Sequence, residues 1–255
     1  MKISVITAVF NNHETIGAAL DSVLSQSHPH TEVIVIDGMS TDGTRDILAS
    51  YSKRFDIYLS EPDDGIYYAL NKGIELATGD VVGFLHSDDV FADSRALERV
   101  AGAFKDESVE AVYGDLVYVK KDDTTRVVRR WIAGPYHKGL LSRGWMPPHP
   151  TLYVRREVYQ RLGRFDIGFL IAADYDCMLR FFCADVKLAY IPYVQVRMRT
   201  GGASNRSLRN IVQKSFEDYT ALRRNRVGGM FALFWKNVSK LPQFFRRNTF
   251  DDQRE

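Results

Sequence analysis

The sequence is poor in cysteine and in net charge, and each shortage narrows the class of protein. Its two cysteines, Cys177 and Cys183, are six residues apart in a stretch with helical spacing. We therefore expect them on different faces of a helix, which argues against a disulfide or metal cluster and indicates a reducing compartment. The formal charge of +2 at pH 7 does not favour nucleic acid as a partner.

Long apolar runs are also missing. No uninterrupted run approaches the roughly 20 residues that span a bilayer. The N-terminal stretch MKISVITAVF stops at Asn11 and lacks the length and cleavage site of a signal peptide. These absences predict a cytoplasmic protein and leave a surface association with the cytoplasmic face of the inner membrane open.

What is present is an ordinary globular composition, with 255 residues, of which 45% are hydrophobic, enough for one large domain or two small ones. Strand and helix patterns alternate through the first hundred residues, which predicts an open α/β sheet with helices on both faces. The expected strands there are residues 3–9, 32–37, 56–60 and 80–85, and the expected helices are residues 13–27, 44–54, 66–77 and 94–104.

After Val109 the rhythm changes, because strand patterns at 109–118 and 126–132 flank the polar turn KKDDTT, so the sheet is expected to become mixed. Further strands are predicted at 152–155 and 186–192, and helices at 157–162 and 174–183. We predict a catalytic unit over residues 1–205, with a nucleotide-sugar half (1–108) and an acceptor half (109–205), followed by a basic helical extension over 206–255.

The strongest sign of a site is that each of the first four strands ends in polar or acidic residues, which would converge on one edge of the sheet. The stretch GFLHSDDVF places Asp88 and Asp89 side by side at the end of a buried strand. Because adjacent carboxylates repel near a core, a lysine or arginine, a helix N-terminus or a metal ion is expected beside them.

The motifs SVITAVFNN, VIVIDGMSTDGT, SEPDDGIYYALNKGIELATGD and FLHSDD stand in the order and spacing of family 2 glycosyltransferases. The resemblance continues through HPTLYVRREVY, AADYDCMLR and RTGGAS, and covers roughly residues 1–205. It implies a GT-A fold and transfer of a sugar from a nucleotide diphosphate donor linked to UDP, GDP or dTDP. The stretch around NKG is similar to the bacterial branch that builds exopolysaccharide and O-antigen units, which implies a saccharide or lipid-linked saccharide acceptor.

The resemblance also implies roles for single residues. Asp89 corresponds to the acid that binds a divalent cation, and Mn²⁺ or Mg²⁺ suits carboxylate and diphosphate oxygens. The positions implied for the donor are Thr7, Ala8, Val9, Asn11, Asp37, Asp63, Gly65, Asn71, Lys72, Ser87, Asp88, His149 and Arg199. Among these, Asp37 resembles the nucleobase-binding aspartate, and Arg199 with Gly201, Gly202 and Ser204 resembles a flexible loop near the diphosphate. His149 is left open between metal, diphosphate, acceptor and a packing role.

The catalytic residue implied by the family pattern is Asp174, as the general base of an inverting transfer. Many relatives carry Glu-Asp there, whereas Ala173 precedes Asp174 in this chain. Asp176 is the rival, and helical geometry turns it about 200° from Asp174, so only one of the two can face a cleft.

The C-terminal tail alternates apolar and basic residues, with Met230, Phe231, Leu233, Phe234, Trp235, Val238 and Leu241 flanked by Lys236, Lys240, Arg246 and Arg247. Two readings stay open: a helix in the headgroup layer of an anionic membrane, or a helix packed on the core. A sugar nucleotidyltransferase, which would need a glycine-rich basic loop after the first strand, and a non-catalytic nucleotide-sugar binding protein are the alternative functions.

Overall fold

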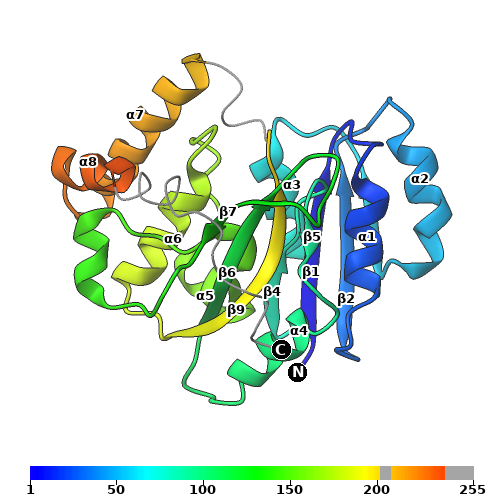
Figure 1. The fold of residues 1–255 in the computed structure, drawn as a ribbon, viewed down its shortest axis with the longest axis horizontal. Helices are drawn as coiled ribbons and strands as arrows, with labels where there is room; N and C mark the ends of the chain where they lie inside the picture. Colours follow the sequence, from blue (N-terminus) through cyan, green and yellow to red (C-terminus); the bar gives the residue numbers. More distant parts are fainter. Residues whose placement is uncertain (202–207, 239–255) are drawn as a thin grey trace.

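The computed structural model describes residues 1–201 and 208–238. Within them, nine strands form one sheet in the order β3-β2-β1-β4-β8-β6-β9-β5, with β7 paired to β6 (Figure 1). The strands are β1 (Ile3–Val9), β2 (Thr31–Asp37), β3 (Ile57–Ser60), β4 (Val81–Phe84), β5 (Val90–Phe91), β6 (Ala111–Val119), β7 (Val127–Trp131), β8 (Tyr153–Arg155) and β9 (Leu188–Arg199).

The sheet is parallel through β1 to β4 and mixed beyond them. β1 pairs in parallel with β2 and β4, whereas β8 runs antiparallel to both β4 and β6. The helices are α1 (Ile16–Leu24), α2 (Thr44–Tyr51), α3 (Ile66–Leu76), α4 (Ala96–Ala103), α5 (Arg156–Leu162), α6 (Ala173–Cys183), α7 (Leu208–Arg224) and α8 (Met230–Val238). The predicted change from a parallel to a mixed sheet after Val109 is therefore confirmed.

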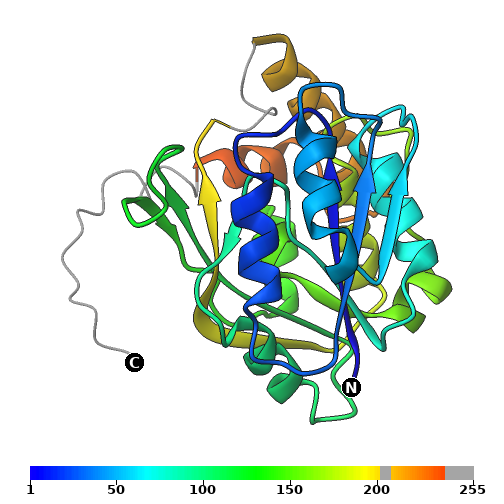
Figure 2. The same ribbon diagram turned by 90° about the vertical axis from the view of Figure 1, so that its right-hand side faces the viewer.

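Two apolar cores lie on the two faces of the sheet. Along β2, Val33 and Val35 belong to one core, and the intervening Ile34 and Ile36 belong to the other. Side chains alternate between faces along a strand, so a strand covered on both sides reads as one continuous apolar run. Figure 2 looks onto α1 and α2, which cover one face side by side, whereas α3 and α6 contribute to the opposite core.

Two strands differ from the prediction. β9 continues to Arg199, past the expected end at Pro192, because its pairing with β6 is irregular around Gly114 and Asp115 and resumes beyond. Proline has no N–H for sheet pairing, and Pro192 lies at this irregularity. β5 has only two residues and gives no pattern to detect. Because β9 extends to Arg199, this residue ends a strand and does not lie in the flexible loop that its motif resembles.

The C-terminal helices α7 and α8 pack on the body beside α6, at the edge away from α1 and α2 (Figure 1). In the described part of the chain, no helix has the length and apolar character needed to cross a membrane. Gly202 and Ser204, and the tail residues Lys240, Leu241, Arg246 and Arg247, lie outside the described residues.

Candidate active site

A cleft of about 950 Å³ opens where the carboxyl ends of β1 to β4 meet, as the polar strand ends predict. Each strand contributes through the loop that follows it. The predicted donor residues that line this cleft are Ala8, Val9, Asn11, Asp63, Gly65, Ser87, Asp88 and Arg199.

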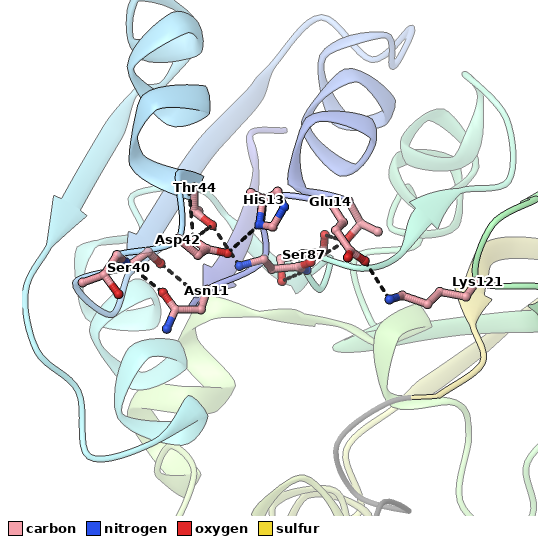
Figure 3. A network of polar contacts seen from close by, with 11 residues as sticks. Asn11, His13, Glu14, Ser40, Asp42, Thr44, Ser87 and Lys121 are labelled. Atoms are coloured by element: carbon pink, nitrogen blue, oxygen red, sulfur yellow. Dashed lines mark hydrogen bonds and ion pairs between the residues drawn. The ribbon is translucent and has the colours of Figure 1, made fainter.

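The loop after β1 is tied to the loop after β2 by a dense set of hydrogen bonds (Figure 3). Asn11 has a φ of 48°, a left-handed conformation that asparagine tolerates. Its backbone N–H donates to Ser40 Oγ at 2.9 Å, and its Oδ1 accepts from the Thr41 N–H at 2.8 Å. The floor of the cleft is therefore held in one geometry by side chains of the two loops.

Two pairs of charged or titratable side chains that line the same cleft contact each other (Figure 3). His13 Nδ1 lies 2.9 Å from Asp42 Oδ2. Although burial acts in the opposite direction, hydrogen bonds from Thr44 and His13 lower the pKa of Asp42. Lys121, which follows β6, forms an ion pair of 2.7 Å with Glu14 and so links the two halves of the chain across the cleft.

The adjacent carboxylates at the end of β4 have different environments. Asp88 lines the cleft, whereas Asp89 is fully buried and accepts a hydrogen bond from the Arg199 backbone N–H at 3.1 Å. Its Oδ2 has no hydrogen-bond partner. Burial, and then the charge of Asp88, raise the pKa of Asp89 well above its usual range. The charge compensation expected beside this pair is thus only partly supplied, by Arg199.

Five predicted donor residues do not line the cleft. Thr7 and Asp37 are buried, and the Asp37 carboxylate accepts from Ser60 Oγ at 2.6 Å. Asn71 bonds through both side-chain atoms to the backbone of Phe165, at 2.9 and 3.0 Å.

Lys72 Nζ lies 2.7 Å from Asp63, so it reaches the cleft only through that carboxylate. Asn71 and Lys72 therefore support the cleft from behind, in place of the direct donor contact that the motif implies. His149, the fifth of these residues, lines a neighbouring cavity. Asp89, which also does not line the cleft, stays a prediction as the cation ligand.

A second cavity of about 600 Å³ adjoins the first and shares Arg199, Thr200 and Gly201 with it. Asp174 and His149 both line this second cavity, so the structure brings the predicted base together with the histidine whose role was open. His149 stacks on Phe84 with ring centroids 5.4 Å apart. Burial lowers the pKa of His149 to about 4, although the charge of Asp174 opposes that change.

The two candidate aspartates of α6 point in different directions. Asp176 is buried in an ion pair with Arg180 at 3.0 Å, accepts from Asn225 Nδ2 at 3.0 Å, and lines neither cavity. Asp174 is half-buried and accepts from Tyr67 Oη at 3.3 Å and from the Tyr175 N–H at 2.8 Å, both at Oδ1. The geometry favours Asp174 over Asp176.

Several lining residues were not found from sequence. Lys121 lies in a turn whose only sequence signal was polarity, and no motif marks Lys214, Asp218 or Lys236, which line the second cavity from α7 and α8. His86 was the one detectable case. It adjoins the acidic pair in the quoted motif FLHSDD, and it also lines the second cavity.

The fold and this pair of adjoining cavities define a GT-A-type α/β enzyme. The family profile of glycosyl transferase family 2 matches residues 4–169, and the chain belongs to that family. The predictions of the family, of the GT-A fold and of a transferase are therefore confirmed.

Relatives and solved structures agree. The chain is 29% identical over 219 residues to a PGL/p-HBAD biosynthesis glycosyltransferase of Mycobacterium bovis, covering 84% of this chain and 81% of the relative. It is 48% identical over 90 residues to the putative teichuronic acid biosynthesis glycosyltransferase TuaG of Bacillus subtilis, covering 34% and 36%.

Among solved structures, S. aureus TarS 1-349 in complex with UDP-GlcNAc has a TM-score of 0.69 at 18% identity, covering 89% of this chain. The chain spans 66% of that TarS fragment. Mannosyltransferase PcManGT from Pyrobaculum calidifontis, in complex with GDP-Man and Mn²⁺, has a TM-score of 0.62 at 19% identity, covering 97% of this chain and 76% of that protein. At these identities the likeness shows the fold alone.

Proposed function

We propose that the chain transfers a sugar, with inversion, from a nucleotide-diphosphate sugar in the first cleft to an acceptor hydroxyl in the second cavity. The observation that carries this proposal is the shared wall at Arg199, which joins a cleft at the strand ends to a cavity lined by Asp174. The donors named for TarS and PcManGT, UDP-GlcNAc and GDP-Man, support a nucleoside diphosphate donor, linked to UDP, GDP or dTDP.

The acidic pair fits a divalent cation that arrives with the donor. Within the described residues no group of three or more His, Cys, Asp or Glu side chains is arranged to hold a metal ion. Mg²⁺ and Mn²⁺ sites that include substrate phosphates need only one or two protein carboxylates. Asp88 at the cleft would supply one, and the partnerless Oδ2 of Asp89 lies next to it in the chain. Neutralisation of the departing diphosphate is the chemistry that such a cation supplies when bound.

Asp174 is the proposed general base. Both of its hydrogen bonds fall on Oδ1, which orients the carboxylate and leaves Oδ2 to take the proton of the attacking hydroxyl. The lowered pKa of His149 keeps the imidazole neutral at pH 7, so we assign it to the acceptor wall as a hydrogen-bonding and packing group.

The test separates the two aspartates of α6. Asp174→Asn should lower turnover by roughly 10²-fold or more and keep donor binding, because only proton transfer is lost. Asp176→Asn is the matched control, since it breaks the Arg180 pair and should lower stability with turnover kept. Nucleotide release from UDP-GlcNAc and GDP-Man with Mn²⁺ measures turnover, and calorimetry measures binding. Normal turnover of Asp174→Asn would refute its role.

The acceptor is proposed to be a lipid-linked saccharide reached at an anionic membrane surface on the cytoplasmic side. α7 and α8 turn Lys214, Asp218 and Lys236 to the second cavity, and they expose several apolar side chains to solvent. Val212 is 70% exposed, and Phe231 and Phe234 are 68% and 60% exposed. Such a face, with the exposed Arg209 and Arg223 on α7, suits an anionic headgroup layer.

In this proposal the two readings of α8 both apply, the membrane to its exposed face and the core to its buried face. Lys236 is an exception to the predicted basic flank, because it is buried against Asp218.

A further inference from the structure

Glu217 of α7 is a buried carboxylate that holds the chain just before α6. It is 4% exposed, and it lies beyond residues 4–169, where the family profile matches. Its Oε1 accepts the N–H of Leu170 at 3.1 Å, and its Oε2 accepts the N–H groups of Ile171 and Ala172 at 2.8 and 2.9 Å. One side chain therefore satisfies three successive backbone donors from another part of the chain.

These donors lie immediately before the helix that carries Asp174, at its N-cap and the two preceding residues. The N-cap residue of α6 is Ala172, which has no polar side chain, so its cap forms no side-chain hydrogen bond. The first N–H groups of a helix need partners and attract negative charge. Although burial acts against it, hydrogen bonds from Gln213 and from residues 170–172 lower the pKa of Glu217, so the carboxylate is charged at pH 7. Glu217 therefore places a negative charge at the start of α6 and binds the N-cap N–H together with the two N–H groups before it.

The same short segment is held from its other side by Tyr67. The Tyr67 hydroxyl donates to the Ile171 carbonyl at 2.6 Å and also lies 3.3 Å from Asp174 Oδ1. Tyr67 is on α3, whose first residue, Ile66, lines the donor cleft. Glu217 and Tyr67 thus hold the backbone of Ile171 at both its N–H and its carbonyl, close to the Asp174 carboxylate.

We propose that Glu217 is a positioning residue that sets the place of the Asp174 carboxylate between the two cavities. The inference rests on the proposed function, in which Asp174 is the base. It makes α7 part of the catalytic apparatus, although the sequence assigns α7 to an extension. A purely structural cap would stabilise α6 equally well, so stability alone cannot separate the two roles.

The experiment compares Glu217→Ala and Glu217→Gln with the control Glu32→Gln. Glu32 is also a buried carboxylate that accepts a backbone N–H, from Thr78 at 2.9 Å, but it lies near the start of β2, at the opposite edge of the sheet. Turnover is nucleotide release from UDP-GlcNAc or GDP-Man with Mn²⁺. Binding of UDP or GDP is measured by calorimetry, and amide exchange is followed over residues 165–176.

We expect Glu217→Ala to lower kcat by on the order of 10²-fold, since a base displaced by about 1 Å loses that much. Nucleotide affinity should stay within about twofold, because the donor cleft is not touched. Glu217→Gln, which keeps one acceptor oxygen, should recover about tenfold of the loss. Exchange at residues 170–172 should accelerate in Glu217→Ala, and Glu32→Gln should keep kcat.

Two results would overturn the inference. One is a Glu217→Ala protein in which residues 170–172 exchange faster while kcat matches that of Glu32→Gln, since Glu217 would then be a cap and nothing more. The other is unchanged protection at these amides, which would show that Glu217 does not hold them. A wild-type protein that neither binds nor turns over any of the nucleotides would overturn the proposed function itself, and with it the role of Asp174.

Discussion

Replacing Asp218 with asparagine tests whether α8 is docked on the catalytic body. Lys236 Nζ lies 2.7 Å from Asp218 Oδ1, and the two side chains are only 3% and 5% exposed. The ammonium group also lies 3.2 Å from the ring centroid of Tyr175, which lines the second cavity. Asp218→Asn would remove the carboxylate from beside that buried cation. Breaking a buried pair in this way costs about 3–5 kcal/mol, which for a chain of this size corresponds to roughly 6–20 °C in Tm.

Urea denaturation of wild type, Asp218→Asn, Lys236→Met and the double variant gives a double-mutant cycle for this pair. The double variant should recover most of the loss, because replacing both charges removes the uncompensated ion and can be close to neutral. A coupling energy above about 1 kcal/mol between the two changes would confirm the contact. A single variant within about 0.5 kcal/mol of wild type, as for an ordinary surface change, would refute the docking of α8.

Three further predictions concern His149, the packing of β4 and the exposed face of α8. Burial lowers the pKa of His149 from 6.5 to about 4, so as pH falls the imidazole is protonated in the unfolded chain before it is protonated in the folded protein. The free energy of unfolding should therefore fall by about 3 kcal/mol between pH 6.5 and 4. Urea midpoints of His149→Phe should lack this slope, and parallel losses in both proteins would contradict it. A Cβ on Gly83 would lie 2.1 Å from the buried ring of Tyr153, so Gly83→Ala should cost about 1–3 kcal/mol in a thermal melt. Gly102→Ala adds a Cβ that meets nothing within 4 Å, so it should stabilise α4 by about 0.5–1 kcal/mol. If the two alanine variants changed the melting temperature equally, the packing of Gly83 against Tyr153 would be contradicted. Phe234→Glu should weaken co-sedimentation of the protein with anionic vesicles at low salt. Unchanged binding of the variant, or no binding of the wild type, would argue against a membrane face.

The fold was predictable where local pattern and tertiary environment agree. Ile3–Val9 of β1 matches the expected strand at both ends, because its residues are mostly β-branched and fully covered by the two cores. β9 was predicted too short because its continuation depends on pairing with β6 around the irregularity at Gly114. Residues 194–199 do alternate apolar and polar side chains, as a strand does, but Pro192 separates them from the preceding run.

The site was predictable where topology alone brings residues together. Parallel strands end at one edge, so Asn11, Gly65 and Asp88 meet in one cleft as expected. The direction of a side chain at that edge depends on its neighbours, which is why Asn71 turned out to bond to the Phe165 backbone. Glu217 gave no sequence signal at all, because its three backbone partners are 45 to 47 residues away in the chain.

The most direct test is a crystal structure of the protein soaked with Mn²⁺ and UDP or GDP, in which the cation is located by its anomalous signal. We predict the nucleotide in the cleft at the ends of β1 to β4, with the Mn²⁺ peak between its diphosphate and the carboxylates of Asp88 and Asp89. A nucleotide bound elsewhere, or a Mn²⁺ peak remote from both Asp88 and Asp89, would contradict the assignment of the donor site.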